Sequence, residues 1–247
     1  MSDTSRTVLR LTGSDRLHFL QGLVSNDVTK LDKGLVYAAM LTPQGKYLAD
    51  FFLVPDHEAV LLDVDSALAG PLLQRLTMYK LRSDVQIIET DLVVSRGLGT
   101  PPEGAFPDPR DPGMGWRGYN GQPGDESLDW TALRVSLGIP QSGIELTPDT
   151  FILEAGFERL NGVDFRKGCY VGQEVTARMK HKTELRKGLV RVAVEGHAAV
   201  GTEIVSDGKT AGTLYSQAGD QGLAYLRFDR AGAAMQAGAA RVTWTTV

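Results

Sequence analysis

The chain has 247 residues, of which 42% are hydrophobic and 23% are charged, and its 26 Lys+Arg against 30 Asp+Glu give a formal net charge of −4. This composition is typical of a globular protein with enough apolar residues for a substantial core. It argues against a general nucleic-acid binder, because phosphate binding needs clustered positive charge, and against a helical membrane protein, because the longest apolar runs fall far short of the roughly 20 residues that span a bilayer.

The cysteine content and the N-terminal residues bear on the compartment. Cys169 is the only cysteine, so the chain forms no internal disulfide and builds no cysteine-rich metal site alone. Residues 1–6 lack the cationic start and apolar stretch of a secretory signal peptide. Together these features predict a cytoplasmic protein.

Strand-like and helix-like segments alternate over the first 96 residues. Apolar residues at helical spacing predict one helix with Ser14 as N-cap and a second helix that begins at Pro71. Apolar runs predict strands over residues 8–11, 37–41, 47–54, 59–64, 85–88 and 92–95. The turn at residues 42–46 joins two of these strands into a β-hairpin. The pattern indicates an α+β sandwich with helices on one face of an antiparallel sheet.

The middle and the end of the chain differ in composition. Residues 97–124 contain eight glycines and six prolines, which predicts a long, exposed and irregular loop or a poorly ordered connection. A helix is expected over residues 127–137, ending at Gly138. Further on, short strands separated by glycine-containing turns are expected at residues 189–194, 203–206, 210–215, 223–228 and 240–245. They predict a small C-terminal β-barrel or sandwich.

The segment around Cys169 is basic. From Arg159 to Arg191 there are nine Lys or Arg and three Asp or Glu, which indicates either a positive surface for an anionic ligand or the solvated face of a helix. The neighbouring Arg166 and Lys167 would favour the thiolate of Cys169. Cysteine is also among the most commonly buried residues, so an inert thiol is the alternative.

Two carboxylates stand in apolar segments. Asp50 lies in the predicted strand 47–54, and Glu154 lies within residues 151–156. A buried carboxylate is costly unless it is paired or binds a ligand, whereas strand alternation would place Asp50 on a solvated face. Asn26 and Asp27, which follow the first helix, are typical of an Asx-type turn.

The motif around Cys169 resembles a family signature. Residues 167–174 read Lys-Gly-Cys-Tyr-Val-Gly-Gln-Glu, which is similar to the K-G-C-Y-x-G-Q-E signature of YgfZ-type folate-binding proteins, relatives of the glycine-cleavage T-protein. Residues 11–27, 41–50 and 78–82 also resemble this family. Residues 161–178 are most similar to the branch that contains a mitochondrial iron–sulfur cluster assembly factor.

The resemblance implies a fold and a role. The fold is a GcvT-like (T-protein-like) ring of two ferredoxin-like α+β portions and a small C-terminal β-barrel, with a folate site at its centre. It divides the chain into a first portion at 1–96, the Gly/Pro-rich loop at 97–124, a second portion with the motif at 125–187 and the barrel at 188–247. The implied role is tetrahydrofolate-dependent support of the assembly or repair of iron–sulfur enzymes, including one that modifies tRNA. Iron–sulfur proteins or cluster carriers are the implied partners, and no direct binding of nucleic acid or membrane is expected.

The resemblance also implies the site residues. Cys169, the residue linked to the iron–sulfur role, is the expected catalytic group together with Lys167. Asp50 and Glu154 are expected to lie close together in a central cavity and to bind the folate. The other expected folate-binding residues are Asn26, Tyr170, Gln173, Glu174 and Arg178. No metal site of the chain's own is expected.

Two other functions compete with this one. A folate-dependent aminomethyl or C1 transferase would use Asp50, but the T-protein has two consecutive aspartates where this chain has Ala49 and Asp50. A scaffold with a degenerate folate pocket is the non-enzymatic alternative. The cysteine signature favours the assembly factor, because it has no place in the transferase mechanism.

Overall fold

The computed structural model of the chain consists of two compact units. Unit 1 comprises Met1–Leu128 and Phe157–Ala177, and unit 2 comprises Asp129–Gly156 and Arg178–Val247. The structure describes residues 5–125, 127–182 and 184–244. The segment 125–187, expected as one portion, contributes to both units, and the four-part division stays a prediction. Within the described residues, no helix is long and apolar enough to span a membrane.

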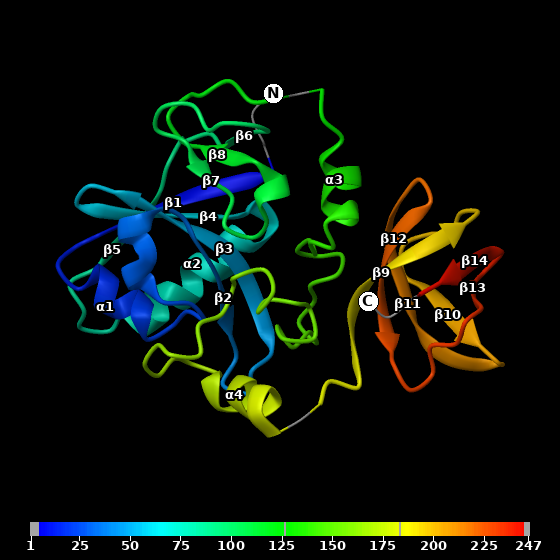
Figure 1. Cartoon of the computed structure of the whole chain (residues 1–247). Coiled ribbons are helices and arrows are strands. Elements are labelled where there is room, and N and C mark those ends of the chain that lie inside the picture. The colour runs from blue at the N-terminus through cyan, green and yellow to red at the C-terminus, as the bar shows by residue number, and fades with distance from the viewer. Residues whose placement is uncertain (1–4, 126, 183, 245–247) are drawn as a thin grey trace. The chain divides into compact units, whose positions relative to one another are not determined.

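Unit 1 is built on a five-stranded antiparallel sheet with the strand order β2-β3-β4-β1-β5 (Figure 1). Its elements in chain order are β1 (Arg6–Thr12), α1 (Arg16–Gln21), the 3₁₀ helix η1 (Val28–Lys33), β2 (Val36–Leu41), β3 (Tyr47–Asp56), β4 (Ala59–Asp65), α2 (Ser66–Lys80) and β5 (Gln86–Glu89). The predicted hairpin is confirmed as the β2–β3 pair.

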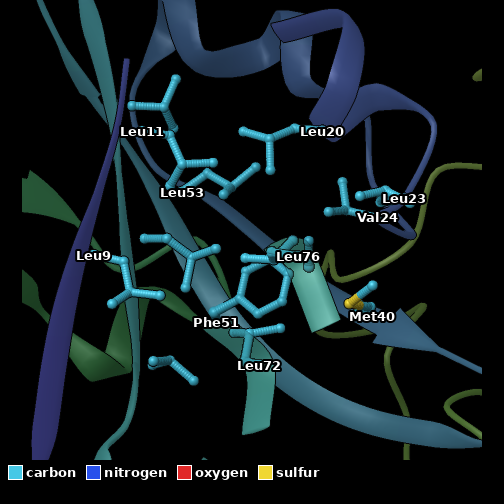
Figure 2. Close-up of a cluster of buried hydrophobic side chains, with 14 of the residues drawn as sticks. Leu9, Leu11, Leu20, Leu23, Val24, Met40, Phe51, Leu53, Leu72 and Leu76 are labelled. Atoms are coloured by element: carbon cyan, nitrogen blue, oxygen red, sulfur yellow. The ribbon is translucent and has the colours of Figure 1, made fainter. Parts of the chain in front are cut away.

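Helices cover one face of this sheet. Side chains along a strand alternate between its faces, and in β3 Phe51 and Leu53 pack in an apolar cluster with Leu72 and Leu76 of α2 (Figure 2). Each fully buried side chain of this size contributes about 1.5–3 kcal/mol, so the cluster is the main support of the unit. The α+β sandwich predicted from the pattern is therefore confirmed. Phe52, at the intervening position, points to the opposite face.

Both helices of unit 1 begin at other residues than predicted. α2 starts at Ser66 rather than Pro71, because the Asp65 carboxylate accepts a hydrogen bond from the N–H of Ala67 and caps the helix there. Pro71 lies inside the helix. The N-cap of α1 is Asp15 rather than Ser14, whose hydroxyl donates to Asp84 instead.

The Gly/Pro-rich segment is not the exposed, irregular loop that its composition predicts. It contributes to a three-stranded sheet of β6 (Ser95–Gly97), β7 (Phe106–Pro107) and β8 (Trp116–Gly118), with the 3₁₀ helix η2 (Pro112–Met114) between the last two strands. Trp116 and Tyr119 are buried. The glycines are the reason, because a Cβ at Gly97 would collide with the Trp116 ring, and Gly115 adopts a φ of +68° that disfavours other residues.

Unit 2 contains the predicted C-terminal barrel. It is a closed barrel with the strand order β10-β11-β12-β9-β14-β13 (Figure 1). Its strands are β9 (Lys187–Glu195), β10 (Thr202–Ser206), β11 (Lys209–Ala218), β12 (Gln221–Arg227), β13 (Met235–Ala237) and β14 (Ala240–Thr243). The short β13 was not expected, and residue 245 of the last predicted strand lies outside the described residues.

Two helices lie between the sheet of unit 1 and the barrel in the sequence. α3 (Trp130–Ser136) belongs to unit 2, where its Arg134 hydrogen-bonds Ser216 of β11 and so fixes the helix to the barrel. α4 (Gln173–Lys182) begins with the last two residues of the cysteine motif.

Candidate functional site

The segment that leads to Cys169 lies along the loop after α1 in unit 1. Ser25 forms the centre of this contact, because its hydroxyl donates to the carbonyl of Gly162 at 2.6 Å and its own carbonyl accepts from the N–H of Asp164 at 3.0 Å. Further along, the N–H of Val171 donates to the carbonyl of Gly22 at 3.3 Å. Residues 161–171 are thereby fixed to residues 22–26, although more than a hundred positions separate the two segments.

Lys167 is buried in this contact, with 7% of its surface exposed. Its ammonium group donates to three main-chain carbonyls, those of Gln21 at 2.8 Å, Val24 at 2.5 Å and Asn26 at 3.0 Å. Burial lowers the pKa of Lys167 to about 8, against the opposing charges of Asp27 and Asp164. The ammonium group is therefore committed to the loop of residues 21–26, and its expected catalytic role beside the thiol stays a prediction.

Cys169 is exposed. Gly168 before it is also exposed, whereas Lys167 and Tyr170 on either side are buried. The thiol thus lies on a two-residue exposed step between two buried anchors. The alternative of a buried cysteine is wrong, and the reactivity of the thiol stays a prediction.

Asn26 is a structural centre of the same loop. It is buried, its amide nitrogen donates to the carbonyls of Tyr37 and Asn161, and its amide oxygen accepts from the N–H of Asp27 and the ammonium group of Lys30. These bonds use both amide N–H donors and both acceptor positions of the side chain. Its expected role as a folate ligand stays a prediction.

The remaining motif residues differ in exposure. Burial raises the pKa of the Tyr170 hydroxyl, so this group stays a neutral phenol. Gln173 begins α4 and is half-buried, and Glu174 in the first turn is exposed. Arg178 is exposed and belongs to unit 2. Their expected contacts with folate stay predictions.

Asp50 is buried in unit 1, on the face of the sheet opposite the helices. Its two carboxylate oxygens accept hydrogen bonds from the hydroxyls of Tyr37 at 2.9 Å and Tyr47 at 2.6 Å. Burial and the charge of Asp50 raise the pKa of Tyr37, which keeps that hydroxyl a donor. Of the two alternatives left by the sequence, the paired and buried carboxylate is the correct one. The ring of Tyr37 stacks on Phe157, with the ring centroids 5.1 Å apart.

A buried network of charges lies on the same face of the sheet and was not found from the sequence. Asp63 of β4 accepts from Arg6 at 2.6 Å, from Arg117 at 2.7 Å and from the hydroxyl of Tyr119 at 2.9 Å. Burial raises the pKa of Asp63, but the charges of Arg6 and Arg117 outweigh it and hold this pKa below its ordinary value. The network joins the small sheet of residues 95–118 to the main sheet.

Arg110 extends this network towards Tyr37. Asp108 accepts from its guanidinium group at 3.0 Å and 2.8 Å, and the guanidinium carbon lies 4.8 Å from the ring centroid of Phe52 and 5.5 Å from that of Tyr37. A cation over an aromatic face is attracted by the ring. The sequence signal that could have revealed this network is the presence of charged residues inside the Gly/Pro-rich segment. In an exposed loop, an Asp and an Arg two residues apart would have no reason to be buried together.

Glu154 is buried in unit 2, so the expected cavity shared with Asp50 stays a prediction. Its Oε2 atom accepts from the hydroxyl of Tyr225 and lies 3.8 Å from the ammonium group of Lys187. Burial, together with the bond to Glu154, raises the pKa of Tyr225. Within the described residues, the Oε1 atom of Glu154 accepts no hydrogen bond.

The chain offers no metal site of its own in the part that the structure describes, where no three His, Cys, Asp or Glu side chains are grouped to hold an ion. A stable iron–sulfur cluster normally takes four protein ligands. A single thiol therefore does not supply the ligands of such a cluster by itself.

Comparison with known proteins assigns the family. Residues 186–246 match the model of the CAF17 C-terminal beta-barrel domain. The chain is 32% identical to the mouse protein named iron-sulfur cluster assembly factor IBA57, mitochondrial, over 90% of this chain and 75% of that protein. The human protein of the same name is 30% identical over the same shares.

The chain belongs to the IBA57 family. This agrees with the resemblance to YgfZ-type proteins and their iron–sulfur branch. An IBA57 homologue of Mycosarcoma maydis is 35% identical over 75% of this chain, and the chain spans about half the length of that relative, 54%. The crystal structure of the glycine cleavage system aminomethyltransferase T from Bartonella henselae has the same fold, with a TM-score of 0.77 and 14% sequence identity. The match covers the whole of this chain and 84% of the Bartonella chain. The GcvT-like fold with a C-terminal barrel is thus confirmed.

The expected cytoplasmic location is wrong. The IBA57 relatives from mouse, human and Mycosarcoma maydis are named as mitochondrial proteins, which points to the mitochondrion. The physical argument was too weak to decide, because a single cysteine excludes an internal disulfide in either compartment.

Proposed function

We propose that the protein is a tetrahydrofolate-binding factor that supports the assembly or repair of iron–sulfur enzymes, with Cys169 as its reactive group. The observation that carries the proposal is the exposed thiol, presented between two buried anchors in the family motif. The names of the IBA57 relatives support the iron–sulfur part. Its partners are iron–sulfur proteins or cluster carriers, because one thiol cannot complete the coordination of a cluster.

The folate part rests on the two buried carboxylates. Glu154 has one oxygen atom that accepts no bond within the described residues, and a carboxylate oxygen binds N–H donors such as those of a pterin ring well. Asp50, in unit 1, is a separate candidate carboxylate beside two tyrosine hydroxyls. Tetrahydrofolate, when bound, supplies a reduced pterin that carries one-carbon units. Ala49, the neighbour of Asp50, packs in the apolar cluster on the other face, which leaves one carboxylate there and disfavours aminomethyl transfer.

The iron–sulfur part is tested in cells that lack their own relative of this protein. Cells with the wild-type chain are expected to regain the activities of iron–sulfur enzymes, including one that methylthiolates tRNA. Cys169→Ser is expected to fail, and Arg166→Ala, which changes an exposed neighbour, is expected to succeed. If Cys169→Ser restores these activities as fully as the wild type, the proposal is wrong.

The folate part is tested separately by calorimetric titration of the purified chain with tetrahydrofolate. Loss of a charged hydrogen-bond partner costs about 1.5–3 kcal/mol, so Glu154→Gln is expected to weaken binding by roughly ten- to a hundredfold. Glu195→Gln, which changes an exposed carboxylate of the same unit, is the matched control and is expected to bind normally. Absence of binding to the wild-type chain would remove folate from the proposal and leave the thiol role to its own test.

A further inference from the structure

The loop after α1 needs hydrogen-bond donors that its own main chain does not supply. Gln21 is the last residue of α1. If the helix continued, the N–H of Ser25 would donate to the Gln21 carbonyl, but this N–H donates to the carbonyl of Ala39 instead. The N–H of Val28, four residues after Val24, donates to the side chain of Gln21. A buried carbonyl without a partner is costly, so these groups need donors from elsewhere in the chain.

Lys167 supplies these donors from a distant part of the sequence. An ammonium group has three N–H donors and no acceptor, and in Lys167 they match the three carbonyls of Gln21, Val24 and Asn26. No neutral side chain offers three donors from one atom at the end of a long aliphatic stem. The side chain is therefore fixed at its tip as well as at its backbone.

The exposed step lies between this fixed side chain and a second anchor. Tyr170 is buried, and the N–H of Val171 bonds to the carbonyl of Gly22. The two residues between the anchors, Gly168 and Cys169, are exposed. A Cβ added at Gly168 would meet no atom within 4 Å, so no described part of the chain covers the step at that position.

We propose that Lys167 is the positioning residue of this site, which clamps the loop to residues 21–26 and holds Cys169 outward at a fixed place for a partner. The inference rests on the proposed function of Cys169 and deepens it. In this proposal Lys167 does not act on the thiol directly. Its ammonium group binds three carbonyls, and this fixes the position of the loop that carries Cys169. The bare backbone of Gly168 lets a partner approach the sulfur closely.

The clamp is tested with a nitroxide spin label joined by a disulfide to Cys169, which is the only thiol of the chain. The wild-type chain is expected to give the electron paramagnetic resonance spectrum of a restricted label. Lys167→Met, which keeps a long stem but has no N–H donors, is expected to give the narrower lines of a mobile loop. The spectra are recorded far below the melting temperature, so a general loss of stability does not change them.

Lys30→Met is the matched control. Lys30 bonds to the side chains of Asn26 and Asp164 in the same pair of loops but to none of the three carbonyls, so the label is expected to stay restricted. The proposal is overturned if Lys167→Met leaves the label restricted, or if Lys30→Met mobilises it equally. Should Lys167→Met not fold, Lys167→Gln, which has two N–H donors, no charge and a shorter reach, takes its place in the same comparison.

The functional consequence is tested in the cells described above. Lys167→Met, with its thiol still present, is expected to support iron–sulfur enzymes as poorly as Cys169→Ser. If Cys169→Ser fails but Lys167→Met with a mobile label succeeds, positioning by Lys167 is refuted and the role of the thiol stands. If Cys169→Ser succeeds, the proposed function is refuted, and the spectra still decide whether the clamp exists.

Discussion

The Asp108–Arg110 pair is a place where one substitution is expected to destabilise unit 1 strongly. Asp108 and Arg110 have side-chain exposures of 1% and 9%, and two side-chain hydrogen bonds of 3.0 Å and 2.8 Å join them, beside a third from the Arg110 main-chain N–H. Asp108→Asn removes the charge that compensates the guanidinium group and leaves it buried against Phe52 and Tyr37. Removing one partner of a buried pair costs about 3–5 kcal/mol, which is the expected loss in the free energy of unfolding.

Unit 2 contains a matched control. Arg227 and Asp229 are also two residues apart and also form two hydrogen bonds, at 3.4 Å and 3.2 Å, but their side chains are 45% and 54% exposed. Exposed pairs of this kind often contribute nothing measurable, because water and salt screen them. Asp229→Asn is therefore expected to leave stability unchanged, although the chemical change is the same.

Stability is measured by urea unfolding followed by circular dichroism, which reports on the helices and strands of both units, because the control lies in unit 2. If Asp108→Asn costs no more than Asp229→Asn, burial of the pair does not matter and the reasoning is wrong.

A second check is the pH dependence of the free energy of unfolding. Burial raises the pKa of Asp108, but Arg110 and Arg117 outweigh it and hold this pKa below its ordinary value, so its contribution is present above about pH 4 and is lost as the pH falls through the lowered pKa. Asp108→Asn is expected to flatten this acid limb.

Two further predictions concern stability. Gly97→Ala places a Cβ against the buried Trp116 ring and is expected to lower the free energy of unfolding in urea by about 1–3 kcal/mol. Gly70→Ala is the control, because a Cβ at this helical position meets no atom within 4 Å, and it is expected to be neutral or stabilising. Equal effects of the two substitutions would contradict the steric argument. Burial lowers the pKa of Lys167 to about 8, below the value of about 10.4 in an unfolded chain, so the unfolded state binds more protons between these values. Stability of the wild type relative to Lys167→Met is therefore expected to rise with pH from about 8 to 10, and a flat or falling difference in unfolding free energy would contradict the shift.

Local periodicity was enough to predict the main sheet and the barrel. The alternation in residues 47–54 sets Phe51 and Leu53 on one face and Asp50 and Phe52 on the other, which is the observed division. Prediction from the local sequence fails for the Gly/Pro-rich segment, because it treats each glycine as a residue that interrupts regular structure. At Gly97 the absence of a side chain is instead what allows the Trp116 ring to pack against the strand. Composition does not distinguish these two uses of glycine.

The candidate site shows the same limit at the level of single side chains. The motif identified Cys169, and a neighbouring lysine and glycine led to the expectation that the cation acts on the thiol. The structure directs the Lys167 ammonium group to carbonyls that lie 141–146 positions away in the sequence. A long side chain can reach in any direction from its backbone, so sequence proximity does not establish its target. Arg117, which reaches Asp63 across 54 positions, is a second case.

The β2–β3 hairpin supports both parts of the candidate site that lie in unit 1. Its second strand carries Asp50, and its turn contacts the segment after Cys169. Gly172 has a φ of +85°, and a Cβ there would lie 2.6 Å from the carbonyl oxygen of Thr42. A Cβ at Gly45 would in turn lie 2.8 Å from the side chain of Val175, so the two chain segments pack at backbone distance. Contact this close fixes the segment after Cys169 to the turn, whereas Gly168 and Cys169 lie before this contact. The second strand of the hairpin thus carries the buried carboxylate, and its turn supports the segment that follows the exposed thiol.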